Sequence, residues 1–225
     1  MKSLESILKE IQNTKVIDGQ IGYKDYIGLD LSVENENLKK LPIDNAIQFE
    51  EYIENYLSMH NAKVAFGGYN EVRNLYKRSE IFNDTAIEER NIHIGLDLWI
   101  KAGTPVLAAV DGRVHSFNNN TGIGDYGPTI ILEHQIEEQK FYTLYGHLSL
   151  ESIVNLKEDS IFKKGEQIAT LGEASVNGDY APHLHFQIIK DISNYKGDYP
   201  GVCSKNNQKF YLENCPNPNI LLKID

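Results

Sequence analysis

Six short runs rich in β-branched and aromatic residues constrain the fold of this 225-residue chain most strongly. They cover residues 104–110, 112–117, 128–134, 140–148, 166–172 and 183–189, with glycine and asparagine turns between them. Such punctuation predicts strands of an antiparallel sheet, sandwich or barrel. Pro105 and Pro182 fall at or just before the start of a run, where a strand tolerates proline.

The N-terminal part has a different pattern, which predicts helices. Apolar residues follow helical spacing over residues 4–11, and a second apolar stripe runs through residues 45–59. The segment 27–33 between them alternates like a strand. The predicted fold class is therefore mainly β with N-terminal helices (α+β), built on a compact antiparallel β-sheet or sandwich core.

The chain divides into three predicted parts. Residues 1–65 form a helical extension packed on the core, and residues 66–195 form the core itself, with Gly67 and Gly68 favouring a turn at the boundary. Residues 196–225 form a loop-rich tail. The two cysteines, Cys203 and Cys215, lie in that tail, where two reduced buried thiols or one disulfide are both open.

Charge and hydropathy exclude several classes of partner. The net charge of −10 should repel nucleic acid and anionic membranes. No apolar stretch approaches the roughly 20 residues that span a bilayer. Charges at Glu5, Lys9 and Glu10 interrupt any signal-peptide core, so the chain as written is expected in the cytoplasm. A periplasmic or extracellular location would require a removed leader or non-classical export.

His93 and Asp97 enclose the segment His-Ile-Gly-Leu-Asp. Neutral imidazole and carboxylate are both good zinc ligands, with bonds of about 2.0–2.2 Å. A spacing of four residues would suit one face of a helix, but Gly95 disfavours a helix here. A bent strand or loop through Gly95 could point both side chains inward, although such a pair also occurs by chance.

His183 and His185 lie two residues apart in a predicted strand, so both imidazoles should leave the same face. Gln187 continues that face, and a solvated polar face is the alternative interpretation. His147 ends an apolar run directly after Gly146, and alone it would be an ordinary hydrogen-bonded histidine.

Together these residues fit a hydrolytic zinc site. Such a site needs three protein ligands and an open position for water, a base near that water and a donor for the oxyanion. The residue types alone leave open which of His183 and His185 would bind the metal. The remaining histidines, which are expected outside the site on strands or at a helix end, are His60, His115 and His134.

The H-x-x-x-D segment at 93–97, Y-G-H-L at 145–148 and H-L-H at 183–185 resemble the motifs of lysostaphin-type (LytM-like) zinc metallopeptidases. The linking segments AGTPVLAAVDGRV, GDYGPTIILEH and FKKGEQIATLGE are similar to that family as well, and the resemblance covers about residues 90–190. It implies a compact antiparallel β core of the duplicated hybrid motif kind, with a groove over the zinc.

The resemblance also implies site roles and a substrate. The ligands of one Zn²⁺ per chain would be His93, Asp97 and His185, while His147 and His183 would be unligated catalytic histidines. The expected activity is that of a zinc endopeptidase acting on peptides, in peptidoglycan cross-links or a related glycine-containing peptide. The oligomeric state has no sequence signal.

Two other functions compete with this interpretation. Two of the linking segments also resemble those of biotinyl and sugar-phosphotransferase carrier domains, in which facing histidines pass a phosphoryl group without metal. Asp97 argues against such a carrier, because its carboxylate would repel the phosphate. A regulatory peptide-binding module that has lost activity is the other alternative, and it fits poorly with an intact set of site residues.

The segment 66–73 precedes the first expected ligand and is placed to line the groove. Asn70 has two interpretations: a turn residue, or a ligand that fills the open zinc position in a latent form, as in some relatives of this family.

Overall fold

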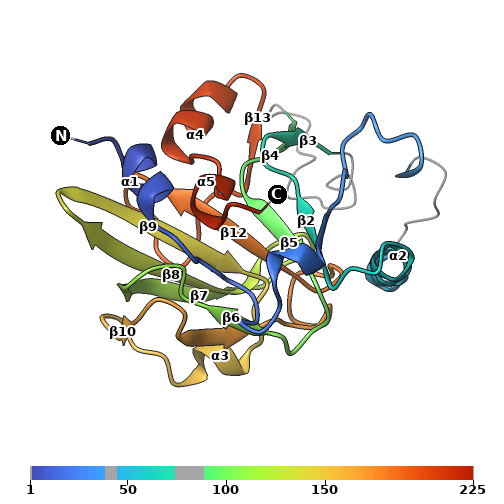
Figure 1. Ribbon diagram of the computed structural model, residues 1–225, viewed down its shortest axis with the longest axis horizontal. Coiled ribbons are helices and arrows are strands. Elements are labelled where there is room, and N and C mark those ends of the chain that lie inside the picture. The colour runs from blue at the N-terminus through green and yellow to red at the C-terminus, as the bar shows by residue number, and fades with distance from the viewer. Residues whose placement is uncertain (1, 39–44, 74–88, 225) are drawn as a thin grey trace.

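An eight-stranded sheet runs through the molecule in this computed structural model, which describes residues 2–38, 45–73 and 89–224 (Figure 1). The strand order is β1-β2-β5-β12-β9-β8-β7-β10. The β1–β2 pair is parallel and the other neighbours are antiparallel. A three-stranded sheet, β13-β4-β3, and a two-stranded sheet, β11-β6, accompany it.

The elements of the main sheet have the following bounds: β1 (Tyr26–Gly28), β2 (Val64–Gly67), β5 (Leu96–Trp99), β7 (Gly112–Asn120), β8 (Gly127–Ile136), β9 (Gln139–Gly146), β10 (Ile161–Phe162) and β12 (His183–Ile189). The smaller sheets contain β3 (Glu71–Val72), β4 (Arg90–His93), β6 (Pro105–Leu107), β11 (Gln167–Thr170) and β13 (Val202–Ser204). The helices are α1 (Leu4–Glu10), the 3₁₀ turn η1 (Tyr23–Asp25), α2 (Ala46–Met59), α3 (Glu151–Val154), α4 (Gln208–Asn214) and α5 (Asn219–Leu222).

The predicted fold class is confirmed: the chain is mainly β and antiparallel, with helices at its N-terminal side. Each of the six predicted runs contains a strand, and the run at 183–189 coincides with β12. The run at 104–110 is shortened to β6, and the chain bends at residues 109 and 110. The helices expected at 4–11 and 45–59 are present as α1 and α2.

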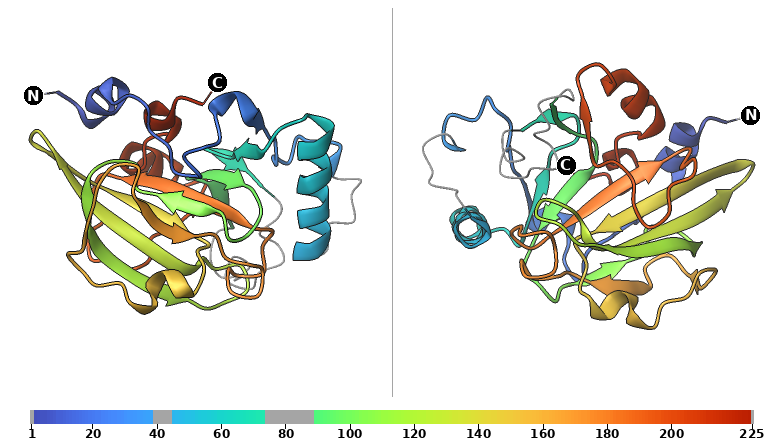
Figure 2. Two further views of the ribbon diagram at one scale, coloured as in Figure 1. Left: turned by 60° about the horizontal axis from the view of Figure 1, so that its bottom comes forward. Right: turned by 180° about the vertical axis from the view of Figure 1, so that it is seen from behind.

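The N-terminal segment supplies strands as well as helices to the body of the molecule. Strand β2 hydrogen-bonds to β1 on one side and to β5 on the other, so this segment forms one edge of the main sheet. Leu4 and Leu8 of α1 are buried in the main core, and α1 packs on α5. Figure 2 shows α2 standing beside the sheet.

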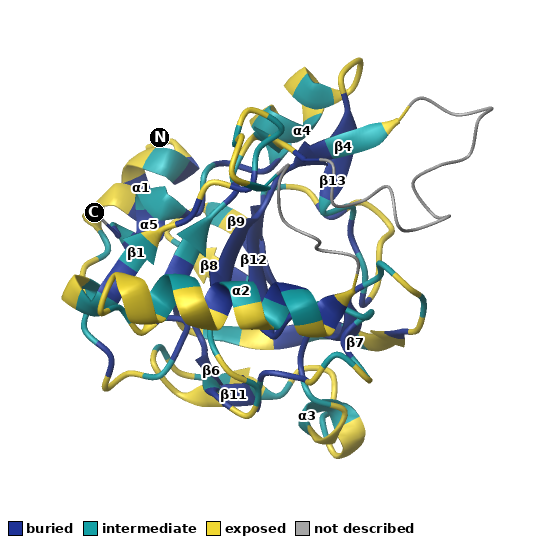
Figure 3. Ribbon diagram, turned by 90° about the vertical axis from the view of Figure 1, so that its right-hand side faces the viewer, coloured by how far each residue is buried: buried dark blue, intermediate teal, exposed yellow. Residues whose placement is uncertain are grey.

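Helix α2 covers a second, smaller core at that edge. Its residues Phe49 and Ile53 are buried with Leu31, Ala65 and Trp99. Figure 3 shows buried and exposed residues alternating along this helix, as an amphipathic stripe requires. Side chains of the N-terminal segment therefore lie directly against a residue of β5, the strand that also carries Asp97.

The C-terminal tail differs from the predicted loop. It contains β13, α4 and α5, and Leu221, Leu222 and Ile224 are buried in the main core. Burial of these apolar side chains against the core stabilises regular elements in a stretch whose prolines predict a loop. Cys203 and Cys215 form no disulfide and both are buried, which agrees with the reduced-thiol interpretation. Within the described ranges, no helix is long and apolar enough to cross a membrane.

We expect the N-terminal segment to stay bound to the core after cleavage, although the predicted division at residue 65 stays a prediction. Residues 16–18 hydrogen-bond to β6, and β2 lies between β1 and β5. Limited proteolysis followed by native gel filtration should therefore give nicked chains that elute together. A folded fragment of residues 1–65 that elutes alone would contradict this expectation.

His134 lies away from the candidate site residues, and its burial should make folding stability depend on pH. The ring is 1% exposed, its Nδ1–H donates to the Asp111 carbonyl at 2.8 Å, and its Nε2 accepts from the Thr143 hydroxyl at 2.7 Å. Burial lowers the pKa of His134 from 6.5 to about 4. The unfolded chain therefore binds this proton first as the pH falls.

The contribution of neutral His134 to stability is full above pH 6.5 and is lost progressively as the pH falls towards 4. A shift of this size corresponds to roughly 3 kcal/mol over that whole range. Urea unfolding of the unaltered chain and of His134→Gln at pH 7 and pH 5 checks this expectation. The variant should be less stable at pH 7 and should lose less stability on acidification. Parallel losses in the two proteins would show that His134 is not the group responsible.

Candidate metal centre

Strand register places the candidate residues together. Strand β12 lies between β5 and β9, and His185 is paired with Asp97 on one side and with Gly146 on the other. His183 leaves the same face of β12, two residues earlier. His147 directly follows β9. The two neighbouring strand pairings thus bring three motifs that are distant in sequence into one place.

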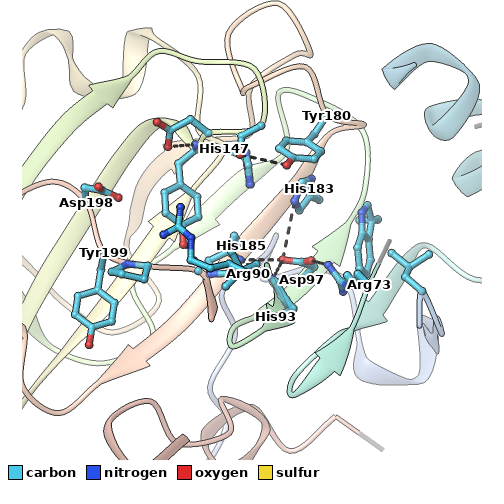
Figure 4. Close-up of a pocket in the computed structure, with 18 of the residues that line it drawn as sticks. Arg73, Arg90, His93, Asp97, His147, Tyr180, His183, His185, Asp198 and Tyr199 are labelled. Atoms are coloured by element: carbon cyan, nitrogen blue, oxygen red, sulfur yellow. Dashed lines mark hydrogen bonds and ion pairs between the residues drawn. The ribbon is translucent and has the colours of Figure 1, made fainter. Parts of the chain in front are cut away.

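His93 arrives from a different sheet. It ends β4, and the chain then bends through Ile94 and Gly95 into β5, which carries Asp97. The bend lets both side chains point into the same space, as a bent strand through Gly95 would. Figure 4 shows His93, Asp97 and His185 converging, with His183 and His147 on one side of them.

Three donor atoms form a triangle. His93 Nε2 lies 2.9 Å from His185 Nδ1, and Asp97 Oδ1 lies 3.2 Å from each of these nitrogens. A tetrahedral metal with bonds of about 2.0–2.1 Å would separate its ligands by roughly 3.3 Å. All three residues are buried, and together they form a group that could hold a metal ion.

The second nitrogen of each histidine in the triangle has its own acceptor. The Nδ1–H of His93 donates to the Gly68 carbonyl at 2.9 Å. The Nε2–H of His185 donates to Gln187 Oε1 at 2.9 Å, and the amide of Gln187 is oriented by its bond to the Pro200 carbonyl at 3.2 Å. These partners assign the tautomers that leave His93 Nε2 and His185 Nδ1 with free lone pairs.

Asp97 is ionised within this group. Burial, the largest influence, raises the pKa of its carboxyl, but electrostatic interactions with His93 and Arg73 oppose it and hold the pKa well below its usual range. Burial and then the Arg73 charge lower the pKa of His93 to about 4. At neutral pH the triangle therefore offers an anionic oxygen of Asp97 and a neutral nitrogen of His93, which are the forms that bind a metal cation.

His147 and His183 lie beside the triangle with ring centroids 4.2 Å apart. Their Nδ1–H groups donate to the carbonyls of Asn177 at 2.8 Å and Ala181 at 2.7 Å. Burial lowers the pKa of both rings, so both are neutral and keep Nε2 available as a base. His147 also has φ of 62°, a left-handed conformation that is uncommon outside glycine and clusters at functional sites.

One pocket opens over these five residues. Its wall includes Tyr126, whose hydroxyl lies 3.3 Å from His185 Nε2. The sequence carries no local signal for the other lining residues, because they come from separate loops, from the start of β4 and from the N-terminal segment. These lining residues include Leu31, Phe49, Arg73, Arg90, Asp125, Tyr180, Asp198 and Tyr199.

The segment 66–73 reaches the pocket through Arg73, not through Asn70. The Asn70 side chain accepts a hydrogen bond from Gln208 at 2.7 Å, and its φ of 57° is that of a turn residue. The hypothesis that Asn70 fills an open metal position is therefore wrong for this structure. The guanidinium of Arg73 instead contacts Asp97 at 2.6 Å.

Comparison with known families agrees with this geometry. Residues 91–197 match the sequence model of peptidase family M23. This part of the chain, just under half of its length, is similar to peptidase family M23. The resemblance to LytM-like metallopeptidases is thereby confirmed, and the five residues at the pocket all lie inside the matched range.

Two curated relatives match part of the chain. An uncharacterized metalloprotease of Haemophilus influenzae is 38% identical over 95 residues, which are 42% of this chain and 18% of that protein. The cell division protein DipM of Caulobacter vibrioides is 32% identical over 94 residues, which are 42% of this chain and 14% of that protein. The match thus spans less than a fifth of either relative's length.

Solved structures of similar proteins were also found. The catalytic domain of lysostaphin from Staphylococcus simulans is 24% identical, with 68% of this chain and 95% of that chain covered and a TM-score of 0.43. LytU is 24% identical, with 56% and 75% covered and a TM-score of 0.37.

Gly95 leaves room for the His185 ring, so Gly95→Ala should disrupt the triangle. A Cβ at this position would lie 2.3 Å from His185 Cε1 and 2.4 Å from Nε2, and the ring cannot retreat without losing its bond to Gln187. We expect divalent metal affinity to fall by roughly tenfold or more. Gly28→Ala is the matched control, because a Cβ there meets nothing within 4 Å. Equal metal affinity in the two variants would show that His185 does not need this space.

Proposed function

We propose that this chain is a zinc-dependent endopeptidase that hydrolyses peptide bonds with a metal-activated water molecule. The observation that carries the proposal is the triangle of His93 Nε2, Asp97 Oδ1 and His185 Nδ1 beside two neutral histidines. Two imidazole nitrogens and one carboxylate oxygen are a donor set that zinc prefers, and catalytic zinc sites keep a further position open. The M23 domain supports peptidase chemistry at this place.

We assign the ligand role to His93, Asp97 and His185 in this proposal, with one Zn²⁺ per chain. Zinc at this position would polarise the scissile carbonyl and lower the pKa of a water molecule to about 7. The carbonyl of Gly68 and the amide oxygen of Gln187 hold the two imidazoles in the orientation that such binding requires.

His147 and His183 supply proton transfer and charge stabilisation. Each ring is fixed by a carbonyl on its Nδ1–H, so the Nε2 atoms are preorganised on the pocket side. Either Nε2 can take the proton of the attacking water, and the protonated ring can then donate to the oxyanion or to the leaving amine. The Ala181 carbonyl and Asp97 favour the protonated form of His183, which eases that step.

The proposed substrate is a peptide of peptidoglycan cross-links or a related glycine-containing peptide. Support comes from the family resemblance and from a pocket whose walls carry aromatic side chains, including Tyr126, Tyr180 and Tyr199. Peptidoglycan lies outside the cytoplasmic membrane, so this substrate would require an exported domain, in contrast to the cytoplasmic location expected from the N-terminal sequence.

Alanine variants of the two histidines on β12 test the assignment most sharply, because both are buried on one face of one strand. We expect His185→Ala to lose zinc, as should His93→Ala and Asp97→Ala. His183→Ala should keep zinc and its fold but lose about 10²–10⁴-fold in cleavage rate, as should His147→Ala. Elemental analysis and mass spectrometry of digested muropeptides and glycine-rich peptides measure the two effects.

Three outcomes would contradict parts of this proposal. Loss of zinc from His183→Ala, with zinc retained by His185→Ala, would exchange the two roles. Retention of zinc by all the ligand variants would place the metal elsewhere. Peptide binding without cleavage by the zinc-loaded chain would favour a regulatory peptide-binding module.

A further inference from the structure

Arg73 connects the N-terminal segment to the triangle of donor atoms. It directly follows β3, and its side chain is only 4% exposed. Its Nη1 donates to Asp97 Oδ2 at 2.6 Å, while its Nε donates to Glu71 Oε2 at 2.5 Å. The other oxygen of Glu71 accepts from the backbone N–H of Leu31 at 3.1 Å. A continuous chain of charge-assisted bonds therefore runs from the N-terminal segment to Asp97.

Local backbone geometry makes room for this guanidinium. Gly68 has φ of 99°, and a Cβ at this position would lie 1.8 Å from Arg73 Nη2 and 3.0 Å from His93 Nδ1. The backbone N–H of Arg73 also donates to the Asn91 carbonyl at 2.8 Å, which continues the pairing of β3 with β4. The short segment 68–73, which contains β3, thus presents both the Gly68 carbonyl to His93 and the Arg73 side chain to Asp97.

The two oxygens of Asp97 consequently face different partners. Oδ1 faces His93 Nε2 and His185 Nδ1 at 3.2 Å, whereas Oδ2 is held by Arg73 on the opposite side. Figure 4 shows Asp97 between the histidines and Arg73. Without the guanidinium, Oδ2 would lose this partner, and either oxygen could face the nitrogens.

We propose that Arg73 is a positioning residue for the metal centre: it holds Asp97 Oδ2, so that Oδ1 alone is offered to the metal, and Glu71 holds Arg73 in place. This inference rests on the proposed metallopeptidase function. Arg73 and Glu71 both precede residue 91, where the M23 match begins. Residues outside the matched range therefore hold Asp97, a proposed metal ligand inside that range.

Zinc affinity of the full chain, measured by competition with a chelator, tests the role of Arg73. Arg73→Met keeps a long side chain but removes the charge and the donors, and we expect affinity to fall by about 10–100-fold, as for other outer partners of metal ligands. Arg73→Lys should not restore it fully, because an ammonium lacks the planar fork that bonds Glu71 and Asp97 together. Arg113→Met is the matched control, since Arg113 is half-exposed and pairs with Glu133 away from the pocket.

A double-mutant cycle separates positioning from a general loosening of the fold. The Asp97→Ala chain should lose zinc on purification, so its weakened affinity is measured by titration with added zinc. In this background Arg73→Met should cause little further loss of affinity, because the bond to Oδ2 is already gone. A loss of the same factor in both backgrounds would overturn the proposal, as would equal affinity of Arg73→Met and the unaltered chain.

Glu71→Gln provides a second measurement if Arg73→Met does not fold. It removes the negative charge that holds Arg73 Nε, so zinc affinity should fall by a smaller factor than in Arg73→Met. Unchanged affinity in folded Glu71→Gln would reject the proposed chain of contacts. Failure of the unaltered chain to bind zinc would instead contradict the proposed function itself. The two failures are therefore distinguishable.

Discussion

Strand β12 hydrogen-bonds to β5 on one side and to β9 on the other, and the geometry of the pocket depends on these two pairings. They set Asp97 opposite His185 on one side. On the other side they set Gly146 opposite His185, so that His147, the next residue, lies beside the same site. A slip of one residue in β12 would turn both of its histidines to the other face of the sheet. The close packing of Leu184, Phe186 and Ile188, all fully buried, opposes such a slip.

Burial of the polar site residues requires that almost every nitrogen and oxygen have a defined partner. Backbone carbonyls accept from His93, His147 and His183, and a side-chain amide accepts from His185. One nitrogen of each imidazole thereby becomes a donor to the protein, and the other is left towards the pocket. The same low-polarity surroundings lower the pKa values of His93, His147 and His183 and keep them neutral, which suits both metal binding and proton transfer.

The N-terminal segment is part of this arrangement in two ways. Strand β2 pairs with β5, and helix α2 packs against Trp99 of that strand. Gly68, after β2, contributes its carbonyl, and Arg73, after β3, contributes its guanidinium. Arg73 lies 5.6 Å from the centroid of the Trp99 ring, and that ring in turn stacks on His183. Packing outside the matched family domain therefore reaches both the proposed ligands and a proposed catalytic ring.

From the sequence alone, we could predict the strands that are bounded by glycine and asparagine turns. We could also predict the site motifs whose residues are neighbours along the chain. The histidines at 183 and 185 share a face because alternate side chains of a strand do so, and Gly95 indicated the bend between His93 and Asp97. Short strands such as β3 and β13 left no comparable signal, since their stability comes from partners distant in sequence. Only the tertiary contacts show which nitrogen of each ring faces the pocket, and that Arg73, not Asn70, reaches the pocket and bonds Asp97. Those outcomes depend on long-range hydrogen bonds and on the space left by Gly68, and neither has a local pattern from which it could be predicted.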